Sequence, residues 1–270
     1  MSTASAPVEI GRVVLTVNDL SRVAAFYQSA LGLNRLSGDG ASVLLGAGSR
    51  VLVELRGDPA ARRAAPREAG LFHTAFLMPS RAALARWLIH AAESGIRLEG
   101  ASDHHVSEAI YLADPEGNGI EVYADRPRDT WYGPDGKLIL TTEGIDLNAL
   151  ARAADKPWTG IPDAAVVGHV HLQVGAVPEA EAFYEGTLGL PVMSHYPGAA
   201  FYGSGGYHHH IATNVWNSRG AGPRAFPATG LAALELLAAP ADHAAILARS
   251  GGVQPTDPWG TSILLQKKAP

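Results

Sequence analysis

Apolar and polar positions alternate in two well-separated segments of the chain, and in each the alternation gives way to the spacing of an amphipathic helix. One segment, VLTVNDLSRVAAFYQSALGLN, begins at Val14, and the other, HLQVGAVPEAEAFYEGTLGLP, begins at His171. At this offset of 157 residues they share eight identities over 21 positions without a gap. Each segment therefore predicts a strand, a helix of about three turns and a helix end at a glycine, Gly32 or Gly189.

Two weaker copies of the pattern complete an internal repeat. One copy runs from Gly70 to Asp125 and the other from Gly230 to Lys268, and each has a strand, an Ala-rich helix and a DPxG turn that leads into a closing strand. In the last copy only five residues separate Gly252 from Pro258, so its middle strands are truncated or missing. Repetition on this scale indicates a chain built from related structural units.

These units predict a fold of the α+β class, in which four βαβββ modules pair into two half-barrel domains and a concave face is walled by two modules. The four modules lie at about 8–56, 68–126, 165–216 and 226–268. We therefore divide the chain into a first module pair at 1–126, a polar and turn-rich connector at 127–164, and a second module pair at 165–270.

Composition restricts both the class of protein and the kind of site. With 47% hydrophobic and 17% charged residues, the 270-residue chain can bury a core and is not disordered. It has no apolar run that could span a bilayer, no signal-peptide pattern and a net charge of −5, so we expect a cytoplasmic protein that binds neither membranes nor nucleic acids. Because cysteine is absent, any metal must bind to His, Asp or Glu.

Three residues of the two central modules could form such a metal site. His73 and His169 occupy the same position of the opening strand in their modules, where the first module has Arg12 and the fourth an alanine. Glu121 lies between apolar neighbours in a closing strand, where a carboxylate is costly unless it is paired or metal-bound, and its counterpart in the fourth module is Leu264. Each residue alone could be a structural histidine or a solvated edge carboxylate. Together, two histidines and one carboxylate suit non-haem Fe(II), with Mn(II) as the alternative.

A second group of polar residues accompanies these three. His104 and His105 precede Tyr111, which stands ten residues before the glutamate of the closing strand. The triplet His208–His210 begins a predicted strand, and strand alternation places His209 on the face opposite to the outer two. The simpler interpretation of the triplet is a polar strand edge or an adventitious metal site.

The motifs of the chain resemble those of the vicinal oxygen chelate superfamily. FYxxxLGL after the first strand and the DPxG turns indicate only the superfamily, which also includes glyoxalases, antibiotic-resistance proteins and epimerases. HTAF, YLADPEGNGIE and HHIA together resemble the extradiol dioxygenases that are similar to catechol 2,3-dioxygenase. The resemblance covers nearly the whole chain.

Carried over residue by residue, the resemblance implies three iron ligands, which are His73, His169 and Glu121. It also implies that His209 is the catalytic acid–base histidine and that Tyr111 is the active-site tyrosine. His104 matches the histidine that helps to handle bound oxygen, with His105 as a rival because the spacing to Tyr111 is shorter than usual.

The function implied is extradiol ring cleavage of a catechol-type substrate with O₂ at a mononuclear Fe(II) site, and we expect a homo-oligomer. A metal-dependent lyase or isomerase similar to glyoxalase would use the three ligands without O₂, and a non-catalytic binding or resistance protein would need no base. Two-domain extradiol enzymes usually keep their ligands in the modules of the second half, whereas here they come from modules two and three. Either these two modules pair directly, leaving one and four to pair, or the site lies at another interface.

Overall fold

The computed structural model describes residues 6–268, and its elements follow the predicted repeat. The first module contains β1 (Val8–Val17), α1 (Leu20–Leu31), β2 (Asn34–Gly38), β3 (Ser42–Ala47) and β4 (Arg50–Gly57). The second contains β5 (Gly70–Leu77), α2 (Arg81–Glu93), β6 (Gly100–Asp103), β7 (Ser107–Ala113) and β8 (Gly119–Asp125). The third contains β9 (Val166–Gln173), α4 (Val177–Glu181) with a π-helical continuation at Ala182–Thr187, β10 (Val192–Tyr196), β11 (Ala199–Tyr202) and β12 (Ile211–Asn214).

The fourth module is the shortened one, as its sequence predicts. It contains β13 (Gly230–Ala238), α5 (Pro240–Arg249) and β14 (Ser262–Lys267). The connector holds a short 3₁₀ turn at Arg128–Thr130 and α3 (Leu147–Ala151). The α+β class with four repeated modules is therefore confirmed.

Local signals end the first helix of each half where the repeat predicts. Gly32 follows α1 with φ +67°, and Gly189 follows the helix of the third module with φ +72°. This left-handed conformation costs a residue with a Cβ more than it costs glycine, so both glycines act as helix stops.

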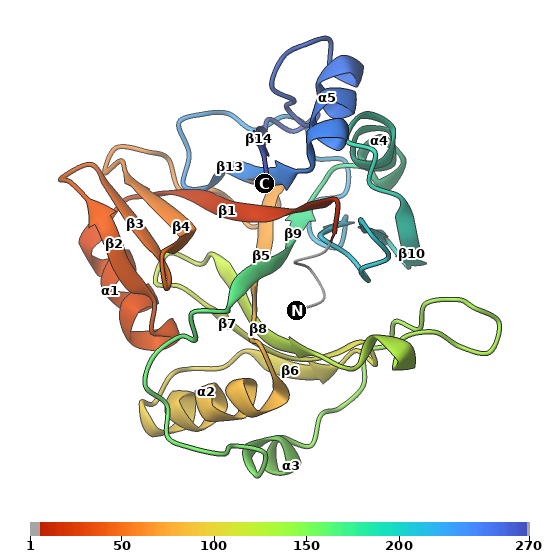
Figure 1. The fold of residues 1–270 in the computed structure, drawn as a ribbon. Coiled ribbons are helices and arrows are strands. Elements are labelled where there is room, and N and C mark those ends of the chain that lie inside the picture. Colours follow the sequence, from red (N-terminus) through yellow and green to blue (C-terminus); the bar gives the residue numbers. More distant parts are fainter. Residues whose placement is uncertain (1–5, 269–270) are drawn as a thin grey trace.

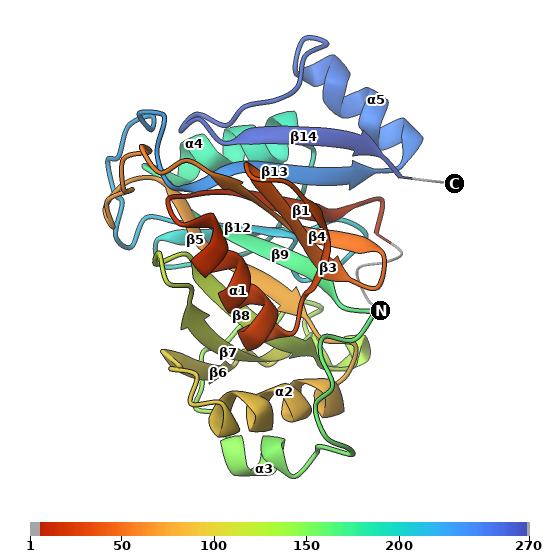
Figure 2. The same cartoon turned by 90° about the vertical axis from the view of Figure 1, so that its left-hand side faces the viewer.

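The modules pair across the two halves of the chain (Figures 1 and 2). Modules two and three form an eight-stranded sheet in the order β10-β11-β12-β9-β5-β8-β7-β6. Modules one and four form a six-stranded sheet in the order β14-β13-β1-β4-β3-β2. Of the two alternatives left open by the sequence, direct pairing of modules two and three is the one observed. Each sheet thus takes one module from 1–126 and one from 165–270, and that division of the chain, with its connector at 127–164, stays a prediction about sequence units.

Apolar side chains from both sheets and from the helices share one large core. Val13 of β1 and Val170 of β9 belong to it, together with Tyr27 of α1 and Trp87 of α2, and all four are fully buried. The indole Nε1 of Trp87 donates a hydrogen bond to the carbonyl of Ala30 at 2.9 Å, which ties α2 to the end of α1. Burial of each large side chain stabilises the fold by about 1.5–3 kcal/mol, so the sheets are held in a fixed relation to each other.

The six-stranded sheet has an arginine where the eight-stranded sheet has a histidine. Strand register places Arg12 relative to Glu54 as it places His73 relative to Glu121. The Nε of Arg12 lies 3.4 Å from a carboxylate oxygen of Glu54 and 3.6 Å from one of Glu235. The guanidinium therefore supplies a positive charge between two carboxylates on this sheet.

We expect replacement of Arg12 by methionine to lower the free energy of unfolding by about 1–3 kcal/mol, because Glu235 then loses its cationic neighbour and faces Glu54, which keeps its ion pair with Arg56. Urea denaturation followed by circular dichroism measures this change. A double variant with Glu54→Gln should recover part of the loss, since it removes one of the two like charges. Equal stability of Arg12→Met and the unaltered chain would contradict a stabilising role of this pair of ion pairs.

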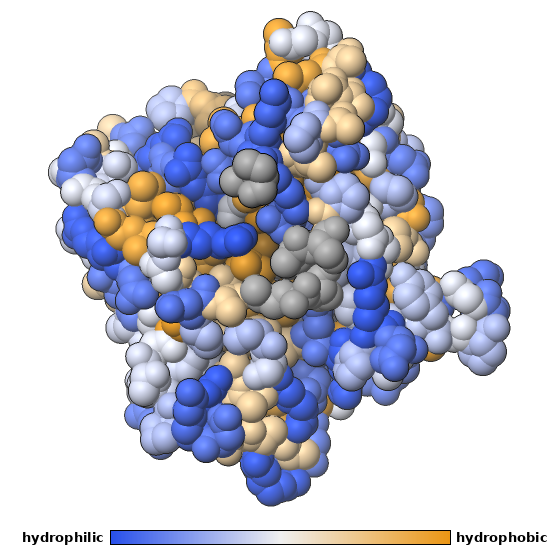
Figure 3. All heavy atoms as spheres, in the orientation of Figure 1, coloured by the Kyte–Doolittle hydropathy of each residue, from blue (hydrophilic) through white to orange (hydrophobic). Residues whose placement is uncertain are grey.

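Two surface features concern the predictions that the protein does not bind membranes and that it forms a homo-oligomer. Within residues 6–268, no helix combines the length and apolar character needed to cross a membrane. Figure 3 shows an apolar area over β2–β4, strands that include the half-buried Leu36 and Leu44. The homo-oligomer stays a prediction.

Candidate functional site

Three neighbouring strands, in the order β9-β5-β8, direct the three candidate metal ligands to one face of the sheet. Ala75 of β5 is the register partner of both Glu121 on β8 and His169 on β9, and His73 lies two residues before Ala75. Register partners and residues two apart in a strand share a face, so all three side chains point the same way. The opening strands of modules two and three thus meet, as the ligand assignment requires.

The donor atoms of the three side chains converge on one point. The Nε2 of His73 lies 3.0 Å and the Nε2 of His169 lies 3.2 Å from the same oxygen of Glu121, Oε2. All three side chains are buried, and their donor atoms lie within 4.8 Å of one another. Among residues 6–268, the buried Nε2 of His73 has no hydrogen-bond partner despite this proximity. Two imidazole nitrogens and a carboxylate oxygen this close together are the donor set that a small divalent cation binds.

The electrostatics of the group also suit a cation. Burial raises the pKa of Glu121, but the neighbouring His169 and His73 outweigh that effect, so its pKa lies well below the ordinary value and the group is a carboxylate. Burial lowers the pKa of His169 in spite of the adjacent Glu121, which favours the neutral imidazole. An ionised carboxylate and a neutral imidazole are the forms that bind metals.

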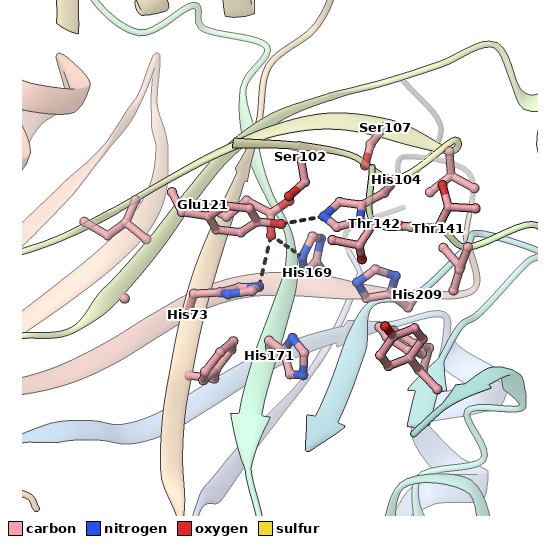
Figure 4. A pocket seen from close by; sticks show the side chains of 18 of the residues that line it. His73, Ser102, His104, Ser107, Glu121, Thr141, Thr142, His169, His171 and His209 are labelled. Carbon is pink, nitrogen blue, oxygen red and sulfur yellow. Dashed lines mark hydrogen bonds and ion pairs between the residues drawn. The ribbon is translucent and has the colours of Figure 1, made fainter. Parts of the chain in front are cut away.

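The triad lies in the wall of a cavity of about 390 Å³. Figure 4 shows His73, His169 and Glu121 together, with His104 and His209 across the cavity from His73. Four aromatic side chains add to the lining: Phe72, Tyr196, Phe201 and Trp216. A cavity of this size with a few converging polar groups suits a small aromatic molecule.

His104 and Tyr111 form a hydrogen-bonded pair at this cavity. The Nδ1 of His104 donates to the carbonyl of Thr141 at 2.6 Å, and its Nε2 lies 2.6 Å from the hydroxyl of Tyr111. A neutral imidazole that donates through Nδ1 accepts through Nε2, so Tyr111 is the donor. Burial and the nearby Glu121 raise the pKa of Tyr111 well above its usual value, and its hydroxyl keeps its proton. Of the two candidates for the oxygen-handling histidine, His104 lines the cavity. His105 instead forms a hydrogen bond through Nε2 to the carbonyl of Thr130.

Of the histidine triplet, His209 is the member that lines the cavity. The triplet precedes β12, which begins at Ile211, so the prediction that it belongs to a strand is wrong and local loop geometry sets its directions. The ring of His209 lies 4.2 Å from that of His169, centre to centre. Burial, followed by the proximity of His169, lowers the pKa of His209 well below its ordinary value. The lowered pKa favours the neutral imidazole, which has one nitrogen lone pair that can accept a hydrogen bond.

Sequence reasoning did not single out His171 or the cavity-lining part of the connector. His171 stands two residues after His169 on the same face of β9, and its Nε2 lies 3.0 Å from the amide Nδ2 of Asn214. Strand alternation from His169 could have identified it. The connector brings Leu140 and Thr141 to the cavity, and the local sequence carries no signal for that contact.

Comparison with known proteins gives both sequence and fold relatives. The sequence profile of the glyoxalase/bleomycin resistance protein/dioxygenase superfamily matches residues 9–122 and 166–263. The chain is 41% identical over 237 residues to a catechol-2,3-dioxygenase of Bacillus subtilis. This alignment covers 86% of this chain and 83% of the relative.

Two solved structures share the fold at low sequence identity. A variant of glyoxalase I from Zea mays superposes with a TM-score of 0.59 at 14% identity, over 97% of this chain and 94% of that one. The CppA protein of Streptococcus pneumoniae superposes with a TM-score of 0.56 at 12% identity, over 96% and 99% of the two chains. At these identities the likeness concerns the fold alone.

Proposed function

Because the chain belongs to the glyoxalase/bleomycin resistance protein/dioxygenase superfamily, we propose that it is an extradiol dioxygenase that cleaves catechols with O₂ at a mononuclear Fe(II) site. The single observation that carries the proposal is the convergence of His73, His169 and Glu121 on one point in the wall of the cavity. The catechol-2,3-dioxygenase relative supports the reaction, and two histidines with one carboxylate favour Fe(II), with Mn(II) as the alternative.

When bound, Fe(II) would bring a catechol and O₂ together and carry electrons between them. The remaining steps belong to side chains of this protein. His209, neutral and at the cavity, would accept the proton that a substrate hydroxyl loses. Tyr111 would donate a hydrogen bond to an oxygen of the substrate or product. His104 would stabilise negative charge on O₂ by donating from Nε2, which requires that its ring bind a second proton because Nδ1 already donates to Thr141.

Metal analysis combined with a spectrum tests the proposal most directly. Protein purified without oxygen should hold one Fe(II) per chain, bind catechol, and on admission of O₂ release a yellow ring-opened product. A lyase or isomerase would keep the metal but show no dependence on O₂, and a binding protein would hold the catechol unchanged. Either of these outcomes would reject the proposed reaction.

The lining of the cavity favours neutral catechols. Its polar members within the described residues include Glu99 but no lysine or arginine. A carboxylate substituent on the ring would therefore enter a largely apolar space, and it would lose hydration without gaining a lysine or arginine as a partner among the lining side chains. Catechols with hydrogen, alkyl or other neutral substituents avoid this cost.

We expect kcat/KM for 3,4-dihydroxybenzamide to exceed that for 3,4-dihydroxybenzoate by about 100-fold or more, which corresponds to about 3 kcal/mol. The two substrates have nearly the same shape, and the ratio compares a neutral substituent with a charged one at the same ring position. Oxygen uptake under pseudo-first-order conditions measures both values. Equal values would show that the substituent reaches bulk water and not the aromatic lining.

A further inference from the structure

A chain of three polar side chains runs away from the cavity behind His209. The Nδ1 of His209 lies 2.8 Å from the Nδ1 of His208, and the Nε2 of His208 lies 2.9 Å from Oδ1 of Asp125, at the end of β8. His208 is completely buried and packs against Tyr207 and Trp131 at ring distances of 4.1 and 4.9 Å. Its ring is therefore fixed, with one nitrogen toward His209 and the other toward Asp125.

The hydrogen bonds among His209, His208 and Asp125 restrict which nitrogen atoms carry protons. A carboxylate has no proton to donate, so Nε2 of His208 carries one and donates it to Asp125. In a neutral ring the Nδ1 of His208 is then an acceptor, and the Nδ1 of His209 must donate to it. The proton of neutral His209 thus lies on Nδ1, which leaves a lone pair on Nε2.

The free nitrogen of His209 is the one available to a ligand. Among residues 6–268, Nε2 of His209 has no hydrogen-bond partner, and the side chain lines the cavity. The other consistent arrangement, with a doubly protonated His208, would place a positive charge in a ring whose centre is 6.2 Å from that of His169, the proposed metal ligand. Repulsion from a bound divalent cation opposes that arrangement.

We propose that Asp125 and His208 are positioning residues that hold His209 as its Nδ1–H tautomer, so that the lone pair of Nε2 faces the cavity. The use of that lone pair as the catalytic base rests on the proposed function. The tautomer itself is a property of the protein and can be measured without turnover.

The tautomer is read from two-bond ¹H–¹⁵N correlations of the full chain labelled with ¹⁵N-histidine and loaded with Zn(II), a diamagnetic substitute for Fe(II). The resonances of His209 are identified by their loss in His209→Phe. We expect His209 to show one protonated nitrogen, Nδ1, in the unaltered protein. A His209 protonated on Nε2 would overturn the proposal.

Substitutions separate positioning from packing. His208→Phe fills the same space but offers no acceptor, so His209 should become a mixture of tautomers and kcat should fall about 10-fold or more with little change in KM and in metal content. His208→Asn places an amide oxygen near the former Nδ1 and should restore the Nδ1–H tautomer and much of kcat. Asp125→Ala frees Nε2 of His208 and should also give a mixture. An unchanged tautomer in His208→Phe would overturn the proposal.

His210→Phe is the matched control for this series. His210 is as completely buried as His208, its Nδ1 accepts from the backbone N–H of Ser204 at 3.2 Å, and it does not line the cavity. We expect the His209 tautomer to be unchanged in this variant, and a change equal to that in His208→Phe would assign the effect to packing and overturn the proposal. If the unaltered protein cleaves no catechol, the proposed function fails, while the tautomer spectra still decide the arrangement of protons.

Discussion

Glu121→Ala should lower the affinity of the protein for Fe(II) by about 100-fold or more and abolish ring cleavage at micromolar iron. Loss of a residue that only supports a metal ligand already costs about 10–100-fold in affinity, so loss of a ligand should cost at least as much. The structure adds that removal of Glu121 leaves His73 and His169 as a two-nitrogen remnant, with no negative charge to balance the ion. Anaerobic titration with Fe(II), followed by metal analysis after gel filtration, measures the affinity.

Glu54→Ala provides the matched control. Glu54 has the same register on the six-stranded sheet that Glu121 has on the eight-stranded sheet, but its partner there is Arg12 in place of a histidine. The Glu54→Ala variant should keep full iron occupancy and activity at a temperature where it is folded. Full occupancy in Glu121→Ala, or equal loss of iron in both variants, would show that the glutamate is not a ligand.

Much of the fold follows from the sequence because the signals that define a module are local. Gly32 and Gly189 end helices through a backbone conformation that any reader of the chain can anticipate. Asp114 and Asp257 of the DPxG turns each accept hydrogen bonds from two backbone N–H groups just after them, which repeats the same turn in modules two and four. Each of these interactions spans four residues or fewer, so a single sequence contains it.

Pairing between modules is different, because it depends on contacts between residues far apart in the chain. No local sequence signal near His73 or His169 predicts that β5 pairs with β9, so the sequence leaves two arrangements of the modules open. The identity of the three candidate ligands was nevertheless accessible, since two repeat-equivalent histidines and a misplaced carboxylate are visible in the sequence itself. Their convergence required the antiparallel register around Ala75.

The walls of the cavity show the same limit. Thr141 reaches His104 across 37 residues, and Asp125 reaches His208 across 83, so neither contact has a local signature. The error at the histidine triplet has a related cause. Strand alternation holds only within a strand, and these residues precede β12, where the direction of each ring depends on its partners: Asp125 for His208 and Ser204 for His210. His209 was selected by the resemblance as well, and its position at the cavity agrees with that choice.

His209→Phe should retain iron and bind catechol, yet cleave it about 10²–10⁴-fold more slowly. Phenylalanine fills the space of the imidazole beside His169 and Phe201, so the cavity keeps its shape while the proton acceptor is lost. Anaerobic binding of catechol followed by mixing with O₂ separates the two quantities, since binding is read before oxygen is admitted and the rate afterwards. The deficit should shrink at high pH, where the substrate loses its proton without help from the protein.

The neighbouring histidines determine how this result is interpreted. His210→Phe, which alters a buried ring outside the cavity, should keep a nearly normal rate, and its folding is checked by the same thermal melt as that of His209→Phe. A normal rate in His209→Phe together with a slow rate in His210→Phe would assign the catalytic base to His210. Normal rates in both, at neutral pH and with full iron, would mean that a catechol hydroxyl gives up its proton without the triplet. In that case Tyr111 and His104, hydrogen-bonded to each other on the β7 side of the cavity, and His171, which also lines it, would be candidates to move the proton.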